Sequence, residues 1–261
     1  MRCGVLAFDL NQTDTIARAG YDCAELSASA VMNIGNAEFK SAKRRLTDSG
    51  LCFDTFYEPL PPDIWICTEG FNTFTWREYL KDVCYRTSEL GGSRFVFSNG
   101  GGRSIPYDGD LPRARELVMT FIRMLCDVAY EYGITVILEP LDKSLSNMYN
   151  TLDECANLIR ILGKSNLTSM CGSQYFSSSG PEDILKNQGI ISHIHLDSPI
   201  LPQPHSLTRV PQKYDGYDYK PFFKMLRQIK YDGLVSVTAG TNSDFEGEIA
   251  GALTFLRDNF L

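Results

Sequence analysis

The sequence predicts a single (β/α)8 barrel, the TIM-barrel class of α/β proteins, spanning residues 1–261. Short apolar segments rich in β-branched residues alternate with helical patterns, and this alternation repeats eight times. It predicts a parallel sheet, because each helix must return the chain to the same edge of the sheet. No linker or change of composition divides the chain, and 261 residues are enough for a closed barrel in one domain.

Each predicted strand is followed by a predicted helix. We expect strands at residues 4–8, 22–29, 51–59, 93–100, 134–141, 167–174, 192–199 and 234–240. The expected helices are 13–20, 36–50, 75–92, 111–133, 151–163, 181–189, 219–230 and 245–260. Helix 111–133 carries an apolar stripe that includes Phe121 and Leu125, and Thr151 and Glu154 have the spacing of a capping box.

An open, doubly wound sheet is the alternative arrangement of the same elements. It commonly carries a GxGxxG motif at the first turn between strand and helix, and the sequence has none there. The three glycines at 100–102 follow the fourth predicted strand and lack that spacing. The closed barrel is therefore the favoured architecture.

Composition limits the classes of partner. The formal net charge is −7, which disfavours nucleic acid as the main partner because phosphate binding depends on a basic surface. The sequence shows no apolar run of about 18 residues, so we expect no membrane-spanning segment. The first residues become polar too soon for a secretory signal, so we expect a cytoplasmic protein.

In a barrel, the carboxyl ends of the strands meet at one mouth, where the active site lies. The carboxylate of Glu139 ends the apolar segment VILEPL, where an ionised group needs a partner, a metal or a cleft. It therefore marks either a site or a structural ion pair, with Lys143 or Arg103 as partner. The polar residues at the predicted strand ends are Glu25, Glu58, Asn99, Glu139, Gln174, His193, His195, Asp197 and Thr238. Two acids and an imidazole at one mouth suit a divalent metal ion.

Five motifs together resemble the xylose isomerase-like barrel family of sugar and sugar-phosphate isomerases and epimerases. They lie at the expected strand ends along almost the whole chain. The motifs are GYDCAEL at 20–26, VFSNGGGRSIP at 96–106, GITVILEPLDKSLSNMYNT at 133–151, ISHIHLDSP at 191–199 and DYKPFFKMLRQIKYDGLVSV at 218–237.

The resemblance implies a divalent metal ion, Mn²⁺, Mg²⁺, Co²⁺ or Zn²⁺, held by four side chains. These are a glutamate on strand five, an aspartate on strand six, a histidine on strand seven and a glutamate on strand eight. Glu139 and His195 match the first and the third, so both are expected metal ligands. The resemblance also implies that Arg209, in TRVPQ, holds the substrate.

The other two ligands are absent from the sequence. Residues 166–179 contain neither aspartate nor histidine, and Thr238 stands at the position of the second glutamate. In the family the two glutamates are implied to move a proton next to a carbonyl group. Glu139 is then the one remaining acid or base, and tight metal binding of the usual kind is not assumed.

Further candidate contacts to a substrate are Arg103, His193, Gln174 and Glu25, beside Arg209. Some of the candidates also have a structural interpretation. Arg103 could lock its own loop, His193 could be structural, and His195 could be a core histidine with satisfied hydrogen bonds.

Three functions remain open. The first is an isomerase or epimerase acting on a small carbohydrate or polyol, and the second is a degenerate barrel that binds a carbohydrate without turnover. The third, a phosphoesterase of the related endonuclease type, needs a metal cluster, and the chain has only His193, His195 and His205. The resemblance leaves room for a homo-oligomer, because relatives are commonly dimers or tetramers.

Overall fold

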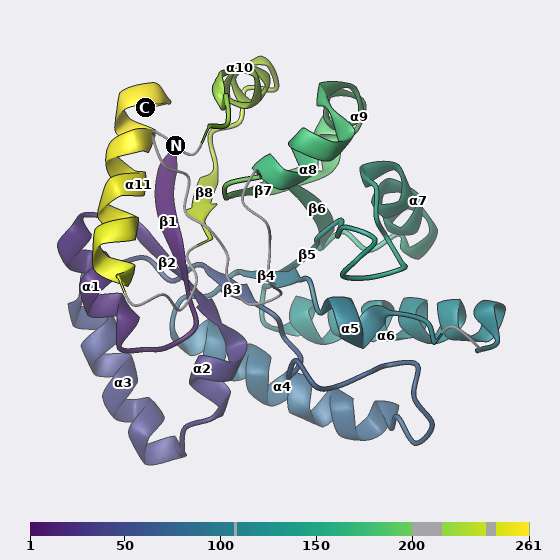
Figure 1. The fold of residues 1–261 in the computed structure, drawn as a ribbon. Helices are drawn as coiled ribbons and strands as arrows, with labels where there is room; N and C mark the ends of the chain where they lie inside the picture. Colours follow the sequence, from purple (N-terminus) through teal and green to yellow (C-terminus); the bar gives the residue numbers. More distant parts are fainter. Residues whose placement is uncertain (107–108, 200–215, 239–243, 261) are drawn as a thin grey trace.

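The eight strands form a closed, parallel barrel in chain order (Figure 1). The computed structural model describes residues 1–106, 109–199, 216–238 and 244–260. The last strand pairs with the first, with Arg2 opposite Leu234 and Val5 opposite Val237. This pairing closes the sheet, which confirms the predicted (β/α)8 fold and excludes the open, doubly wound alternative.

The strands are short and the helices between them vary in length. The strands are β1 (Arg2–Ala7), β2 (Cys23–Ser27), β3 (Thr55–Tyr57), β4 (Arg94–Phe97), β5 (Thr135–Leu138), β6 (Leu167–Gly172), β7 (Ile191–Leu196) and β8 (Leu234–Val237). The longer helices are α1 (Gln12–Ala19), α3 (Asn36–Asp48), α4 (Thr73–Glu89), α6 (Leu111–Glu131), α7 (Leu152–Leu162), α10 (Lys220–Gln228) and α11 (Phe245–Asn259). Shorter helices are α2 (Ala28–Met32), α5 (Gly100–Arg103), α8 (Ser173–Ser179), α9 (Pro181–Lys186) and the 3-10 turn η1 (Gln188–Ile190).

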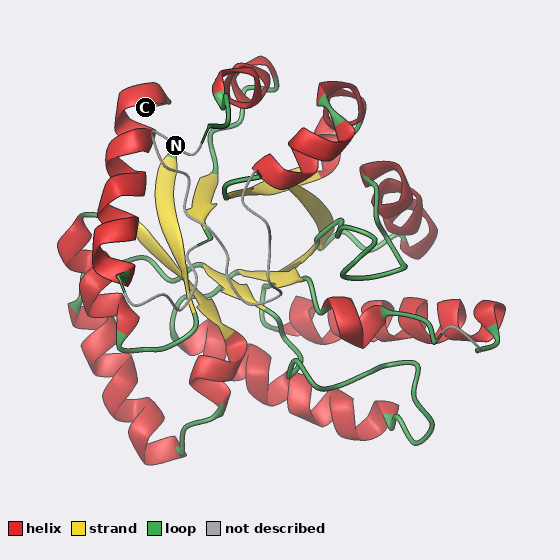
Figure 2. Ribbon diagram, in the orientation of Figure 1, coloured by secondary structure: helices red, strands yellow, loops and turns green. Residues whose placement is uncertain are grey.

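The helices surround the ring of strands (Figure 2). Helix α7 begins with the predicted capping box: Thr151 accepts a hydrogen bond from the Glu154 amide, and the Glu154 side chain accepts one from the Thr151 amide. It ends at Gly163, whose φ of 60° is the left-handed conformation that favours glycine. None of the described helices is both long and apolar enough to cross a membrane.

Some predicted strand ends differ from the structure. Strand β5 ends at Leu138, so Glu139 lies one residue beyond it, next to Pro140, which has no amide hydrogen to continue the ladder. Residues 173–174 begin helix α8 instead of extending β6. Both differences place polar side chains beyond the strands, at the mouth of the barrel.

Most of the apolar core lies between the strands and the helices. It contains the outward-facing residues of the strands, such as Val5, Phe97 and Leu138, packed against the helices. Inside the barrel the apolar cluster is small: Val96, Ile137 and Met170, with Tyr57 against them. The rest of the interior is therefore open to polar side chains, and these build the candidate site.

Candidate functional site

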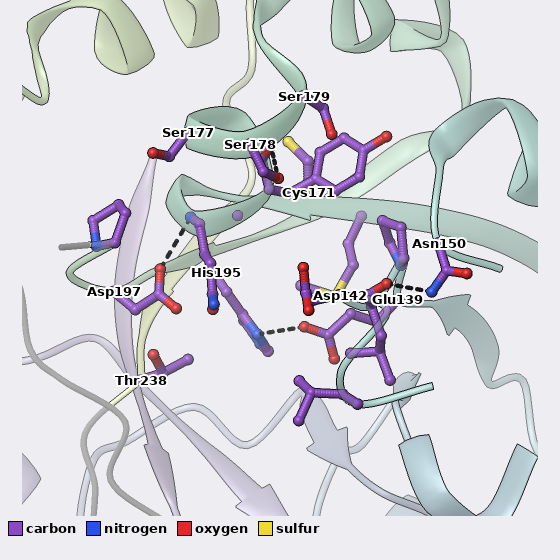
Figure 3. A pocket seen from close by; sticks show the side chains of 18 of the residues that line it. Glu139, Asp142, Asn150, Cys171, Ser177, Ser178, Ser179, His195, Asp197 and Thr238 are labelled. Atoms are coloured by element: carbon purple, nitrogen blue, oxygen red, sulfur yellow. Dashed lines mark hydrogen bonds and ion pairs between the residues drawn. The ribbon is translucent and has the colours of Figure 1, made fainter. Parts of the chain in front are cut away.

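A cavity of about 520 Å³ opens at the carboxyl ends of the strands, where the fold class predicts it (Figure 3). Its lining includes Tyr57 from β3, Glu139 beyond β5, Gly172 from β6, and His195 from β7. Asp197 and Thr238, which follow β7 and β8, also line it. A cavity of this size accommodates a small molecule.

Strand β7 and the residue beyond it supply three polar side chains. His193, His195 and Asp197 lie two positions apart along the chain, and alternate residues of a strand point to the same side. His193 and His195 both contact Glu25, which lies on β2 across the barrel. All three side chains therefore point into the barrel, with His193 deepest and Asp197 at the mouth.

Glu25 lies below the cavity between the two histidines. Its side chain is 0% exposed, and its two oxygens lie 2.8 Å from His193 Nε2 and 3.1 Å from His195 Nε2. Burial alone would raise the pKa of Glu25, but the two histidines outweigh it and hold this pKa well below its usual range. Glu25 is therefore a buried carboxylate that accepts hydrogen bonds from both rings.

The two histidines differ in charge. Burial lowers the pKa of His193 although Glu25 opposes it, so this ring is neutral and donates from Nε2. Burial also acts to lower the pKa of His195, but Glu25 and Glu139 raise it to about 10. His195 is therefore protonated at neutral pH, with Nε2 toward Glu25 and Nδ1 toward the cavity.

Glu139 meets His195 from the other side. Its Oε1 lies 3.6 Å from His195 Nδ1, and its Oε2 is buried without a hydrogen-bond partner among the described residues. Arg103, which is 0% exposed, holds the backbone at this point by donating to the carbonyl oxygens of Glu139, Phe97 and Tyr149. The Glu139 carboxylate is thus fixed at the cavity wall, and the hydrogen-bonding capacity of its buried Oε2 is not satisfied by the described residues.

Asp197 is held by the start of helix α8. Its Oδ1 accepts hydrogen bonds from Ser173 Oγ at 2.6 Å and from the Gln174 amide at 3.2 Å. Its Oδ2 makes no hydrogen bond within the described part of the chain. Burial raises the pKa of the Asp197 carboxyl. Figure 3 shows Asp197 and Glu139 on either side of His195.

Tyr57 of β3 lines the cavity, and Ser98 and Glu58 lie next to it. The Ser98 hydroxyl lies 2.7 Å from Tyr57 Oη and 3.0 Å from Glu58 Oε1. Burial raises the pKa of Glu58 and that of Tyr57. Glu58 and Asn99 have positive φ angles, of 53° and 24°, although neither is glycine. Such backbone strain is most often found at functional sites.

The structure brings the predicted residues together at different depths. Glu139, His195 and Gln174 line the cavity, whereas Glu25 and His193 lie beneath it. Arg103 is also beneath the surface, and its three hydrogen bonds go to backbone carbonyls. The arginine expected to hold the substrate, Arg209, lies outside the described residues, as does His205.

Two residues of the site were not singled out by the sequence. Asp197 was only one of several polar residues at strand ends, and its position two residues after His195 is the signal that could have given it a role. Tyr57 lines the cavity and its ring lies 5.9 Å from that of His195, centre to centre. In the sequence Tyr57 is one aromatic residue in an apolar strand and carries no such signal.

The side chains present do not fit the four-ligand metal site that the resemblance implies. Gly172 and Thr238 stand near the positions of two carboxylates, and neither residue supplies a charged ligand. Glu139 and His195 are the two members of that set that the chain retains. The site is therefore best explained by the chemistry of its carboxylates and its imidazole.

In the described part of the chain, two groups of three residues have potential metal-ligand atoms within 4.8 Å of one another. In Glu25, His193 and His195, both carboxylate oxygens already accept hydrogen bonds from the rings. In Cys23, Cys52 and Asp54, the Arg2 guanidinium occupies the place of a cation, 2.5 Å from Asp54 Oδ2 and 3.2 Å from Cys52 Sγ. Neither group includes Glu139 or Asp197.

Comparison with known proteins gives a family and a fold. The model of the xylose isomerase-like TIM barrel family matches residues 13–259. A D-psicose 3-epimerase solved in the presence of D-fructose is similar over 99% of both chains, with a TM-score of 0.82 and 17% identity. A 3-keto-D-glucoside 4-epimerase from E. coli has a TM-score of 0.81 and 20% identity, again over 99% of both chains. A probable 3-DHS dehydratase from Bacillus anthracis has a TM-score of 0.75 and 15% identity, over 98% of this chain and 99% of that one. No curated protein matches the chain by sequence.

Proposed function

Because the chain belongs to the xylose isomerase-like TIM barrel family, we propose that it is an isomerase or epimerase of a small sugar, sugar phosphate or polyol. The proposal rests on one observation above all: Glu139 lines the cavity with Oε1 beside the protonated His195, and its Oε2 has no partner among the described residues. A carboxylate in this position can remove a proton from a carbon next to a carbonyl group.

The surrounding side chains suit a polar ligand. A sugar or polyol would bring hydroxyl groups, which can donate to the free oxygen of Glu139 and accept from or donate to Thr238 Oγ1, a second buried atom without a partner among the described residues. His195 Nδ1 is positioned to donate to the carbonyl oxygen of a bound ketose. That hydrogen bond would strengthen as negative charge develops on the oxygen, and so would stabilise the enediolate.

Glu25 and Arg103 act through other groups in this proposal. Glu25 holds His195 in the orientation that sends Nδ1 toward the cavity. Arg103 fixes the backbone from which Glu139 projects. Both are positioning residues, and neither needs to contact the substrate.

Substitution of Glu139 by Gln tests the proposal. D-fructose, D-allulose and D-tagatose are suitable first substrates, because similar folds were solved as epimerases with these sugars or their relatives. Turnover should fall by about 10²–10⁴, the usual contribution of a general acid or base, while the circular dichroism spectrum is unchanged. The exposed Glu69 gives a matched control, since Glu69→Gln should leave turnover unchanged. Unchanged turnover in Glu139→Gln would remove Glu139 from the mechanism.

A carbohydrate-binding barrel without turnover is the second candidate. It is favoured by Thr238, which stands where the resemblance implies a second catalytic glutamate. This candidate predicts that calorimetry detects sugar binding, lost in Glu139→Ala, while no sugar is converted. Measurable epimerisation of one sugar would exclude it. A cytoplasmic location and a homo-oligomeric state remain expectations from the sequence.

A further inference from the structure

We propose that Asp197 is the second proton-transfer carboxylate of the site and faces the substrate carbon from the side opposite Glu139. The inference rests on the proposed function and deepens it, because two groups on opposite sides favour epimerisation over isomerisation. A single base can move a proton between neighbouring carbons, whereas inversion at one carbon needs a proton removed from one face and delivered to the other.

The position of Asp197 is the first support. Asp197 follows β7 and Glu139 follows β5, so the end of β6 lies between them. That end is Gly172. A Cβ atom at this position would lie 3.1 Å from the carbonyl oxygen of His195. Gly172 and both carboxylates line the cavity, and Figure 3 shows Asp197 and Glu139 on either side of His195.

The orientation of Asp197 is the second support. Ser173 and the Gln174 amide both bind Oδ1, and the Ser173 hydroxyl also lies 2.9 Å from the Asp197 amide nitrogen. These contacts fix the carboxyl group and leave Oδ2 at the cavity. The resemblance implies an aspartate near the end of β6. In this chain Ser173 and Gln174, just after β6, instead hold Asp197, which lies just after the neighbouring strand β7.

The proposed reaction balances without a further reactant. Glu139, as a carboxylate, takes the proton from the carbon next to the carbonyl, and the electrons of the C–H bond form the enediolate. Asp197, as a carboxylic acid, then gives its proton to the opposite face of the same carbon. The reverse reaction exchanges the two roles, and proton exchange with water restores the starting state.

Hydrogen exchange in D₂O separates the two carboxylates. With D-fructose and D-allulose as probes, the wild-type protein should convert each sugar into the other and place deuterium on the inverted carbon, read by proton NMR. Asp197→Asn should slow this conversion by about 10² or more, yet still exchange the hydrogen of the one epimer that presents it to Glu139. Glu139→Gln should show the mirror pattern and exchange only the other epimer. Asp48→Asn, at an exposed position, is the matched control and should behave as wild type.

A second variant guards against misfolding of Asp197→Asn. Ser173→Ala removes one hydrogen bond to Oδ1 and keeps the carboxylate, so kcat should fall several-fold with little change in KM. Normal epimerisation in Asp197→Asn, or exchange of both epimers by it, would overturn the inference while leaving the proposed function intact. If Asp197→Asn fails to fold, an unchanged kcat in Ser173→Ala overturns the inference. Absence of conversion and exchange in the wild-type protein, for these sugars and D-tagatose, would overturn the proposed function and the inference together.

Discussion

Replacing Glu25 by Gln should destabilise the protein and change how its stability depends on pH. The substitution keeps the size of the side chain but removes the buried charge that pairs with His195 and accepts from His193. Removing one partner of a buried ion pair costs about 3–5 kcal/mol. For a chain of this size that corresponds to a fall in Tm of roughly 10 °C.

The sign of the pH dependence follows from His195. Burial lowers its pKa, but Glu25 and Glu139 together raise it from 6.5 to about 10. This rise corresponds to roughly 5 kcal/mol of stabilisation. The contribution is fully present below about pH 6.5 and is lost as the pH rises through the folded-state value near 10. In Glu25→Gln the pKa of His195 should fall. The variant therefore has little of this stabilisation to lose as the pH rises from about 6.5 to about 10.

Urea denaturation followed by circular dichroism, at pH 7 and at pH 10, measures both effects. The free energy of unfolding should differ between wild type and variant by about 3–5 kcal/mol at pH 7, and this difference should narrow at pH 10. Glu69→Gln serves again as a control of the same chemistry at an exposed position. Equal stability at pH 7, or a difference that does not change with pH, would refute the reasoning about the buried charge.

Three other substitutions test separate parts of the structure. Arg103→Met should lower the free energy of unfolding by about 2–4 kcal/mol, because it loses the hydrogen bonds that fix the backbone at Glu139. Turnover should fall as well, since Glu139 is then less well positioned. Chemical denaturation measures the first effect and steady-state kinetics the second. Thr238→Glu should raise the affinity for Mn²⁺ by about tenfold or more, since it restores a carboxylate at the mouth, and calorimetry would contradict this if affinity stays unchanged. Gly102→Ala should cost about 1–3 kcal/mol, because its Cβ would lie 2.6 Å from the carbonyl oxygen of Ile64; an unchanged urea midpoint would show that the loop moves aside freely.

The fold could be predicted because it depends on repeated local patterns. Each strand and helix carries its own signal, such as the capping box at Thr151 and the apolar stripe through Phe121 and Leu125. Strand ends were less accurate where polar residues follow an apolar run. At Pro140 the sheet stops for lack of an amide hydrogen, and at Ser173 the chain turns directly into a helix.

The candidate site could be predicted only in part, because contacts across the barrel have no local signal. Glu139 and His195 stand out as polar residues at the ends of apolar strands, and the structure places them side by side. The pairing of Glu25 with His193 joins residues 168 positions apart, which no pattern in the sequence reports. The burial of Arg103 is likewise a tertiary effect: the sequence leaves open a substrate contact or a lock on its own loop, and the structure shows hydrogen bonds to three backbone carbonyls.

The two separate apolar cores have a consequence for how such a barrel changes over evolution. The large core lies outside the sheet, and only a few apolar residues fill the inside, so most of the stabilising burial does not involve the side chains that face the mouth. Side chains that face the mouth can therefore be substituted while most of the core is kept. Gly172 and Thr238 line the mouth and take no part in the large core, so a change at either position leaves that core in place.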